Sequence, residues 1–492
     1  MLITGRLHAW LIASAYLYLL IPIVIFLAGW TTLFLALPVG FFLFYLVFAK
    51  FQDSFQNTNF EPLYISKRII FWVITVLCLW CIFSGIGGFS FQNSDFNYRN
   101  AVFHDLIHFP WPVVYCPATD VSPPATPPVL LLYYFNYWLP AACVGKIFNT
   151  AVGEFFLFLW TWVGLVLVYY FVIAYLKRVS ILPLFIFIFF SGADIVGTYI
   201  LRGSFPPLGT HLEWWTFMQY SSITSCLYWV FNQAVPAWLG TILFMQEKTI
   251  GVRFFLVALV FTFSPFPAIG LLGIFCITMA FELFSWEGNG KRKQQYAYIA
   301  AGLVVFIVYS LFDAQTGRGL GLFFLSGVPL KIFAPQYLLF VFLEFFCISF
   351  CCFHILKYQY NILVAACILL YVIPFFQIIS TLDFVMRVSI PSLFILCVFT
   401  IQSLLQKNVT VFDKFYKYIL LALLVIGSIT PISEIYRSAI LTLFDYDHII
   451  ANGVVTFKDP KKQTSTFCCS NYQNSFYWRY LAPSSRVVCP RE

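Results

Sequence analysis

Charged side chains that could take part in catalysis follow one of the early apolar segments. Asp95, Arg99 and Asp105 lie in a polar stretch directly after the apolar run 69–87. A carboxylate there could accept a proton from an alcohol. An arginine could bind a phosphate or pair with an acid. Asp95 and Asp105 are therefore candidate bases and Arg99 a candidate anion ligand, and an ordinary solvated loop is the alternative.

A further candidate acid lies inside a long apolar run. Asp194 belongs to the run 181–200, where an ionisable side chain is costly unless it faces a cavity or a partner. A place in the same site and an ion pair with nearby Arg202 both fit this position. The next polar segment adds three candidates: His211, Glu213 and Trp214. They suit sugar binding or acid–base chemistry, although such residues also form aromatic belts at membrane interfaces.

Two later arginines are candidate phosphate ligands. Arg387 follows Asp383 by four residues, which predicts an ion pair if the segment is helical. Its planar guanidinium can also bind phosphate oxygens at two points. Arg318 lies in a Gly-rich stretch that is not a P-loop, because neither a strand nor a Lys-Ser/Thr pair accompanies it.

A metal site has only weak support. His104, Asp105 and His108 could gather around a divalent cation, but three residues of one loop are a weak signal. We therefore assign no metal ligand and no cofactor, with a divalent metal left open.

Membrane-spanning helices must position these residues. Hydrophobic residues make up 61% of the 492 residues and charged residues 10%, and the mean hydropathy is +0.87. A soluble domain has about 25% charged residues. Apolar runs of about 20 residues recur, each long enough to cross a bilayer. The absence of alternation excludes a β-barrel, and the scattered basic residues argue against nucleic acid as a partner. We predict an all-α polytopic membrane protein.

The apolar runs predict about 13 transmembrane helices, within a range of about 11 to 14. The expected spans are 8–28, 31–49, 69–87, 153–176, 181–200, 224–246, 254–265, 267–285, 296–312, 336–356, 360–380, 388–405 and 418–434. Ser264 to Pro267 is expected to form a tight turn between two short helices.

The distribution of charge predicts the orientation. With the N-terminus in the cytosol, every inner turn is basic, which fits the positive-inside rule and a bacterial inner membrane. Residues 1–434 would form the transmembrane domain, with a long outer loop at 88–152, and residues 435–492 a small extracytoplasmic segment. We also expect Cys468 or Cys469 to form a disulfide with Cys489, because all three would lie outside the cell.

The outer loop is expected to carry interfacial helices. Its apolar stretch 129–148 is interrupted by Asn136, Pro140, Gly145 and Lys146. If this stretch crossed the membrane, Lys177 and Arg178 would lie outside, against the charge rule. Amphipathic helices at the outer interface are therefore the better interpretation.

This layout resembles the GT-C superfamily of membrane glycosyltransferases. The resemblance rests on an acid just after an early span (Asp95), a long outer loop, a Pro127-Pro-x-x-x-x-Tyr-Tyr134 stretch, and a span that ends at Lys177-Arg178. It covers residues 69–180. Two spans precede the usual first one, and an Asp-Asp or Asp-Glu doublet is lacking.

The resemblance implies an activity and a set of partners. Such enzymes move a sugar from a polyprenyl-phosphate-type lipid donor to a glycan, lipid or protein acceptor at the extracytoplasmic face. Asp95 would be the base, with Asp105 as the alternate. A transporter or flippase of lipid-linked glycans is the main alternative, although matching inverted halves are not evident. A glycan polymerase or ligase of related architecture is a third possibility.

Overall fold

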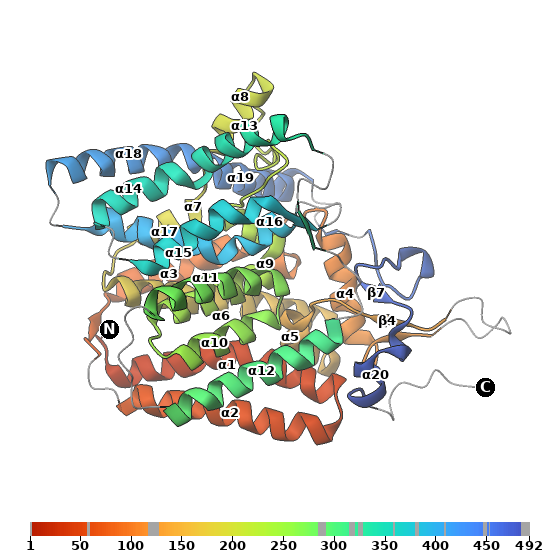
Figure 1. Ribbon diagram of the computed structural model, residues 1–492. Coiled ribbons are helices and arrows are strands. Elements are labelled where there is room, and N and C mark those ends of the chain that lie inside the picture. The colour runs from red at the N-terminus through yellow and green to blue at the C-terminus, as the bar shows by residue number, and fades with distance from the viewer. Residues whose placement is uncertain are drawn as a thin grey trace, which may run out of the picture.

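The computed structural model describes residues 2–56, 60–116, 127–283, 292–313, 320–322, 328–357, 360–378, 383–407, 410–445, 450–451 and 453–483. The molecule is a bundle of helices that run side by side, with a small sheet and short helices at one end (Figure 1). The prediction of an all-α membrane protein is confirmed, since eight helices of the described residues are long and apolar enough to cross a membrane. The larger count of about 13 spans stays a prediction.

Helices account for most of the described chain. The first half contains α1 (Gly5–Trp30), α2 (Leu33–Gln56), α3 (Lys67–Ile82), α4 (Phe96–His108), α5 (Leu139–Ile147), α6 (Thr150–Leu176), α7 (Leu182–Phe189), α8 (Asp194–Arg202) and α9 (Ile223–Gln246). The second half contains α10 (Ile250–Phe261), α11 (Pro265–Leu283), α12 (Arg292–Asp313), α13 (Leu330–Val341), α14 (Cys347–Leu356), α15 (Asn361–Val372), α16 (Asp383–Val388), α17 (Ile390–Leu405), α18 (Val411–Gly427), α19 (Ile429–Phe444) and α20 (Phe476–Tyr480). Each predicted span overlaps one of these helices.

Several predicted spans are not continuous α-helices; the run 418–434, for example, is divided at Ser428 between α18 and α19. The run 181–200 is divided into α7 and α8, and residues 190–193 between them are not helical. The run 336–356 contains a π-helical turn, Phe342–Phe346, between α13 and α14. Such irregular backbone within apolar segments is typical of sites where polar groups must be placed.

A three-stranded sheet joins the long loop to the C-terminal segment. β3 (Val114–Tyr115), β4 (Val129–Leu131) and β7 (Cys468–Cys469) pair antiparallel in that order. Tyr477 also donates a hydrogen bond from its hydroxyl to the Trp30 carbonyl at the end of α1. We call this end of the molecule, which carries β3, β4 and β7, the sheet end. Two-stranded pairs form between β1 (Leu2–Ile3) and β2 (Leu63–Tyr64), and between β5 (Leu320–Leu322) and β6 (Phe376–Ile378).

The predicted disulfide is wrong. Cys468 and Cys469 are both thiols, and the disulfide-bonded cysteine among the described residues is Cys116. The two thiols lie on β7, where the backbone pairs with Leu130 and Leu131, so the sheet register fixes their place.

The stretch 129–148 does not form one long helix. It contains β4, a short 3-10 turn (Asn136–Trp138) and the nine-residue helix α5. α5 packs on α4 and α6, with Ala141 and Ala142 fully buried.

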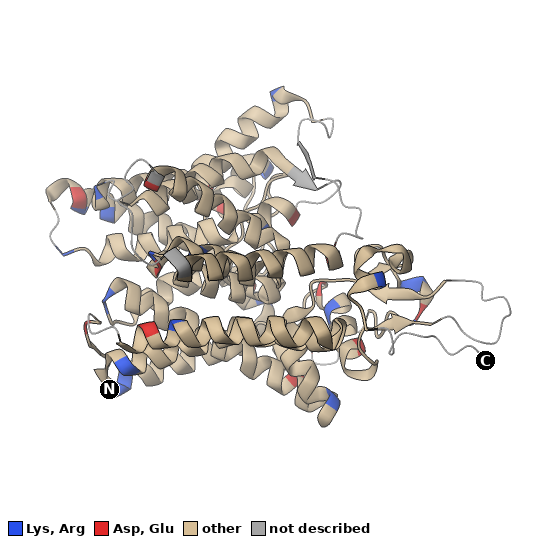
Figure 2. Cartoon of the chain, turned by 60° about the horizontal axis from the view of Figure 1, so that its bottom comes forward, with Lys and Arg blue, Asp and Glu red and all other residues tan. Residues whose placement is uncertain are grey.

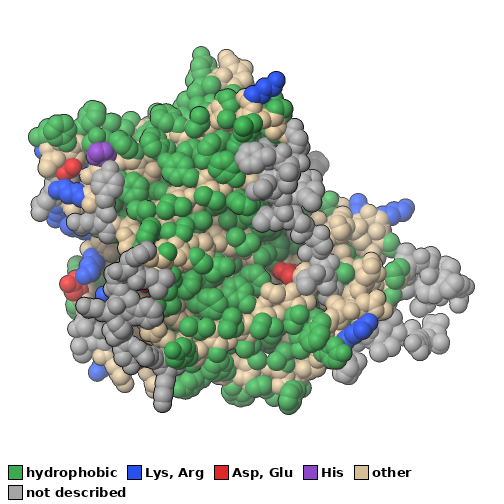
Figure 3. All heavy atoms as spheres, in the orientation of Figure 1, with side chains coloured by type: hydrophobic (Ala, Val, Ile, Leu, Met, Phe, Trp, Pro, Cys, Tyr) green, Lys and Arg blue, Asp and Glu red, His purple; other side chains and the backbone are tan. Residues whose placement is uncertain are grey.

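The surface of the bundle has the character of a lipid-facing surface. Figure 3 shows a face dominated by hydrophobic side chains, and charged residues gather mainly toward the two ends of the bundle in Figure 2. Large apolar side chains such as Phe34 and Phe412 are 92% and 78% exposed. α9, by contrast, is buried along most of its length.

Close helix contacts depend on small residues. A Cβ atom added at Gly164 of α6 would lie 2.4 Å from the Tyr18 hydroxyl oxygen and 2.7 Å from Val235 Cγ1. This approach allows Tyr18 to hydrogen-bond Tyr137, whose hydroxyl in turn donates to Thr161.

Gly164→Ala is expected to destabilise the protein by about 1–3 kcal/mol, because the added methyl group overpacks this contact. Gly40→Ala in α2 is the matched control, since a Cβ there meets nothing within 4 Å. Thermal unfolding in detergent measures both. Equal melting temperatures for the two variants would contradict the close packing of α1, α6 and α9.

Candidate functional site

The first part of the site is built at the start of α4. Asp95 precedes the helix, and its backbone N–H donates to Asn93 Oδ1 at 3.1 Å. One turn later, Arg99 Nη2 donates to Asp95 Oδ2 at 2.7 Å. Arg99 is only 3% exposed, and its guanidinium lies over the rings of Phe96 and Phe231. The Asp95 side chain remains 39% exposed, so the pair presents its carboxylate to solvent and its cation to the interior.

The second part comes from α16. Arg387 Nη2 lies 2.9 Å from Asp383 Oδ1, which confirms the predicted ion pair. Arg387 Nη1 donates to the hydroxyl of Tyr134, and the guanidinium lies over the ring of Phe266. Arg387 is buried, whereas the Asp383 side chain is 42% exposed. Arg387 therefore repeats the arrangement of Arg99 with a different set of neighbours.

A pair of tyrosines joins the two parts. The rings of Tyr133 and Tyr134 lie 4.0 Å apart between centroids. Burial raises the pKa of Tyr133 well above its usual value, and the neighbouring Tyr134 adds to the shift, whereas Arg99 and Arg387 both lower it. Both arginines must therefore lie within electrostatic range of the same buried phenol.

The second arginine keeps its charge in this environment. Burial alone lowers the pKa of Arg387, but Tyr134, Asp383, Tyr133 and Asp95 raise it further than burial lowers it. Because Asp95 raises the pKa of Arg387, the first and second parts of the site also lie within electrostatic range of each other. We call Asp95, Arg99, Tyr133, Tyr134 and Arg387 the arginine–tyrosine site.

Each arginine of this site keeps one donor that the protein does not use. Arg99 Nη1 and Arg387 Nε are buried and have no hydrogen-bond partner among the described residues. An unpaired buried N–H of a charged group is costly, and native structures usually pair it. Phosphate oxygens are acceptors that pair with such donors through charge-assisted hydrogen bonds.

A second set of polar residues surrounds the break between α7 and α8. Asp194 Oδ2 accepts hydrogen bonds from Ser191 Oγ at 3.0 Å and Thr430 Oγ1 at 2.8 Å. Trp215 Nε1 lies 3.2 Å from Asp194 Oδ1 and 3.3 Å from Glu344 Oε1. Close approach is possible because Gly192 lacks a side chain: a Cβ there would lie 2.1 Å from Glu344 Oε2.

Glu213 is held at the N-terminus of α9. It accepts hydrogen bonds from Gln219 Nε2 at 3.0 Å, Ser221 Oγ at 2.5 Å and the backbone N–H of Ser222 at 2.9 Å. The positive end of a helix dipole favours a carboxylate there. Burial nevertheless raises the pKa of Glu213, although His211 opposes the shift.

His211 connects this set to α19. Its Nδ1 lies 2.6 Å from Glu434 Oε1, while Trp229 Nε1 donates to Glu434 Oε2 at 3.0 Å. Arg437 also pairs with Glu434. Burial lowers the pKa of His211, but the hydrogen bond to Glu434 and the nearby Glu213 outweigh burial and raise it. We call Asp194, Glu213, Glu344 and Glu434 the buried acid cluster.

The predicted candidates therefore divide into separate groups. Asp95, Arg99 and Arg387 belong to the arginine–tyrosine site, and Asp194, His211 and Glu213 belong to the buried acid cluster or contact it. Arg202 does not pair with Asp194; its Nη2 donates to the Trp214 carbonyl at 2.9 Å instead. Trp214 is 51% exposed and packs beside His211. Arg318 lies outside the described residues.

Asp105 lies apart from both groups and joins segments of the fold. Its Oδ2 accepts hydrogen bonds from Tyr115 Oη at 2.6 Å and from the Phe457 backbone N–H at 2.9 Å. Its Oδ1 lies 3.0 Å from His104 Nδ1, and the residue is fully buried. This geometry ties α4 to β3 and to the C-terminal segment.

The residues considered for a metal site, His104, Asp105 and His108, make contacts of other kinds. The rings of His104 and His108 stack at 4.1 Å, and His108 Nδ1 hydrogen-bonds the His104 carbonyl. Among the residues that the structure describes, no group of three or more His, Cys, Asp or Glu side chains could hold a metal ion.

Three important residues were missed by sequence reasoning. Tyr134 was noted only as part of a motif, and Glu434 lies at the end of an apolar run, without a distinguishing feature. Glu344 carried a usable signal, because an acid deep in an apolar run usually has a partner or faces a cavity.

Comparison of the chain with protein-family models, with curated proteins and with solved structures finds no match. The fold and the geometry define the chain as a multi-pass helical membrane protein with two buried polar sites. The resemblance to the GT-C superfamily stays a prediction.

Asp105→Ala is expected to destabilise the protein by about 3 kcal/mol, because it leaves the Tyr115 hydroxyl and the Phe457 N–H buried without an acceptor. The C-terminal segment should then become sensitive to protease. Asp459→Ala is the control, since Asp459 is exposed and binds only the local Lys461 N–H.

Thermal unfolding and limited proteolysis of the purified protein measure both effects. Unchanged melting and protease resistance in Asp105→Ala would contradict this structural role.

Proposed function

We propose that this chain is a membrane transferase that moves a sugar from a lipid-phosphate donor to an acceptor hydroxyl. The observation that carries the proposal is the pair of buried arginines, each with an unused donor, beside the half-exposed Asp95. The donor would be a polyprenyl-phosphate-type lipid, and the acceptor a glycan, lipid or protein.

The proposed reaction assigns one role to each charged group. The acceptor oxygen attacks the anomeric carbon of the sugar, and the bond between that carbon and the phosphate oxygen breaks. Asp95 takes the proton from the acceptor hydroxyl, since an alcohol is a weak nucleophile at neutral pH. The bonding electrons leave with the lipid phosphate, whose added negative charge Arg99 Nη1 and Arg387 Nε stabilise.

Asp95 can act in this way because only part of its carboxylate is occupied. Arg99 binds Oδ2 and fixes the orientation of the group, while the side chain stays 39% exposed to an incoming acceptor. Asp383 plays the corresponding part for Arg387. The two acids limit the positive charge of the site, and they leave Arg99 Nη1 and Arg387 Nε without a partner among the described residues.

The surroundings suit an amphipathic donor. The rings of Phe96, Phe231 and Phe266 pack against the guanidiniums, and the ring of Tyr133 lies tilted against Phe467 of the C-terminal segment. Aromatic faces can support both a sugar and an isoprenoid chain. In this proposal the sheet end faces away from the cytosol, in keeping with the basic turns at the opposite ends of the spans.

Transport of a lipid-linked glycan is a second candidate function. The buried acid cluster favours it, because carboxylates buried between membrane helices often mark proton paths. Proton-driven uptake into vesicles, abolished by Glu344→Gln, would support transport. A polymerase or ligase would use the chemistry of the arginine–tyrosine site with a larger donor.

Loss of either unused donor should slow transfer. Arg99→Lys and Arg387→Lys keep the positive charge but lose the planar guanidinium that can bind phosphate oxygens at two points. We expect turnover to fall about a hundredfold in each variant. Asp95→Asn should cost a factor of about a hundred or more, because it removes the base. The assay follows a labelled sugar from a panel of synthetic polyprenyl-phosphate sugars, with the purified protein in liposomes.

Arg479→Lys is the matched control, because Arg479 is an exposed arginine of α20 at the sheet end. It should retain full activity. If the control is active on a donor and all three site variants match it while remaining folded, the proposed function is wrong.

A further inference from the structure

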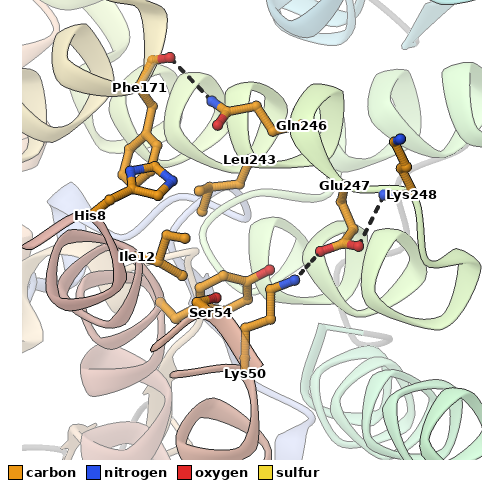
Figure 4. A pocket seen from close by; sticks show the side chains of 10 residues that line it. His8, Ile12, Lys50, Ser54, Phe171, Leu243, Gln246, Glu247 and Lys248 are labelled. Carbon is orange, nitrogen blue, oxygen red and sulfur yellow. Dashed lines mark hydrogen bonds and ion pairs between the residues drawn. The ribbon is translucent and has the colours of Figure 1, made fainter. Parts of the chain in front are cut away.

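A pocket lies at the opposite end of the molecule, where α1 begins and α9 ends. Its volume is about 430 Å³, within the usual range for small-ligand sites. α1, α2, α6 and α9 all contribute side chains to it, and Figure 4 shows them around the opening. The pocket is far along the bundle from the arginine–tyrosine site and plays no part in the proposed transfer.

The carboxylate in the pocket is already satisfied. Glu247 Oε2 pairs with Lys50 Nζ, and Oε1 accepts the backbone N–H groups of Lys248 and Thr249, both at 2.9 Å. Burial raises the pKa of Glu247, but Lys50 and these hydrogen bonds lower it further, so the group stays ionised. Glu247 therefore fixes Lys50 in place and adds no free negative charge.

The donors that remain favour an anion. An ammonium has three N–H groups, and Glu247 takes one of those of Lys50. His8 uses Nδ1 for the Tyr170 hydroxyl at 2.7 Å, which leaves its other ring nitrogen for a ligand. Ser54 adds a hydroxyl, and Lys248 is an exposed cation at the rim.

The rest of the lining is mostly apolar, apart from the Tyr16 hydroxyl and Gln246, whose Nε2 donates to the Phe171 carbonyl. Ile12 and Leu243 line the pocket together with Phe171. The ring of Phe171 lies tilted against that of His8 in α1 and edge-on to that of Tyr170 in α6. A fully hydrated ion would gain little from such walls. A phosphate attached to a short apolar or glycerol-like group would use both the donors and the walls.

We propose that this pocket binds a phosphate group, with Lys50, His8 and Ser54 as its ligands. The phosphate could come from a phospholipid headgroup of the adjacent leaflet or from a small soluble phosphate ester. The two sources share the same chemistry and differ in whether acyl chains strengthen binding.

Binding is tested with the full-length protein in detergent and three probes: inorganic phosphate, dihexanoyl phosphatidate and dihexanoyl glycerol. Thermal shift titrations should show saturable stabilisation by phosphatidate and none by the phosphate-free diacylglycerol. If inorganic phosphate binds as tightly as phosphatidate, the source is soluble. If phosphatidate binds at least about tenfold more tightly, the source is a lipid headgroup.

Ile12→Trp fills the pocket and leaves every charge in place, so it should abolish the shift. Lys50→Met should weaken binding about tenfold, through loss of a charge-assisted hydrogen bond. The matched controls are Ile307→Trp on the exposed face of α12 and Lys407→Met at an exposed turn, and both should bind as the unmodified protein does.

Lys50→Met leaves Glu247 without its cation and can lower stability, so Ile12→Trp decides the outcome if that variant fails to fold. The proposal is overturned if no phosphate probe produces a saturable shift. It is also overturned if Ile12→Trp binds phosphatidate as tightly as Ile307→Trp.

Discussion

The cost of burying charge in apolar surroundings governs this structure. A guanidinium or carboxylate taken from water into a helix bundle loses several kcal/mol of solvation unless other groups replace the water. Only 10% of the residues are charged, yet several of these lie deep between helices. Arg99 and Arg387 each have a carboxylate one turn away and an aromatic ring beneath the guanidinium. These local partners make burial of the two cations possible.

The same cost of burial applies to the polar groups that lack partners. Glu213 is surrounded by hydroxyl, amide and backbone donors, and Asp105 by the adjacent His104, the Tyr115 hydroxyl and the distant Phe457 N–H. Nη1 of Arg99 and Nε of Arg387 are the buried arginine donors without a partner among the described residues. We propose that these two cationic donors bind a ligand, because a lipid phosphate has the charge and the oxygens that they require.

The sequence was sufficient to predict those parts of the structure that depend on local composition. Apolar runs located the helices, and the spacing of Asp383 and Arg387 predicted their ion pair. Asp95 and Arg99 became candidates because a charged stretch follows directly after an apolar run, and the two residues form an ion pair. These features depend on neighbours within a few residues, which a single sequence displays.

The rest depends on contacts between distant segments. An ion pair with Arg202 was one of two interpretations of Asp194, but Asp194 accepts hydrogen bonds from Thr430 and Trp215, which only the folded bundle brings near. Asp105 was considered a base, and the Phe457 N–H that it binds comes from the C-terminal segment. Tyr134 lies beside Arg387 for the same reason. Composition and spacing carry no information about such pairs.

The most direct measurement is an experimental structure of the protein with a short-chain polyprenyl phosphate. The account predicts phosphate oxygens within hydrogen-bond distance, about 2.7–3.2 Å, of Arg99 Nη1 and Arg387 Nε. A phosphate bound elsewhere, with both donors paired to protein groups, would contradict it.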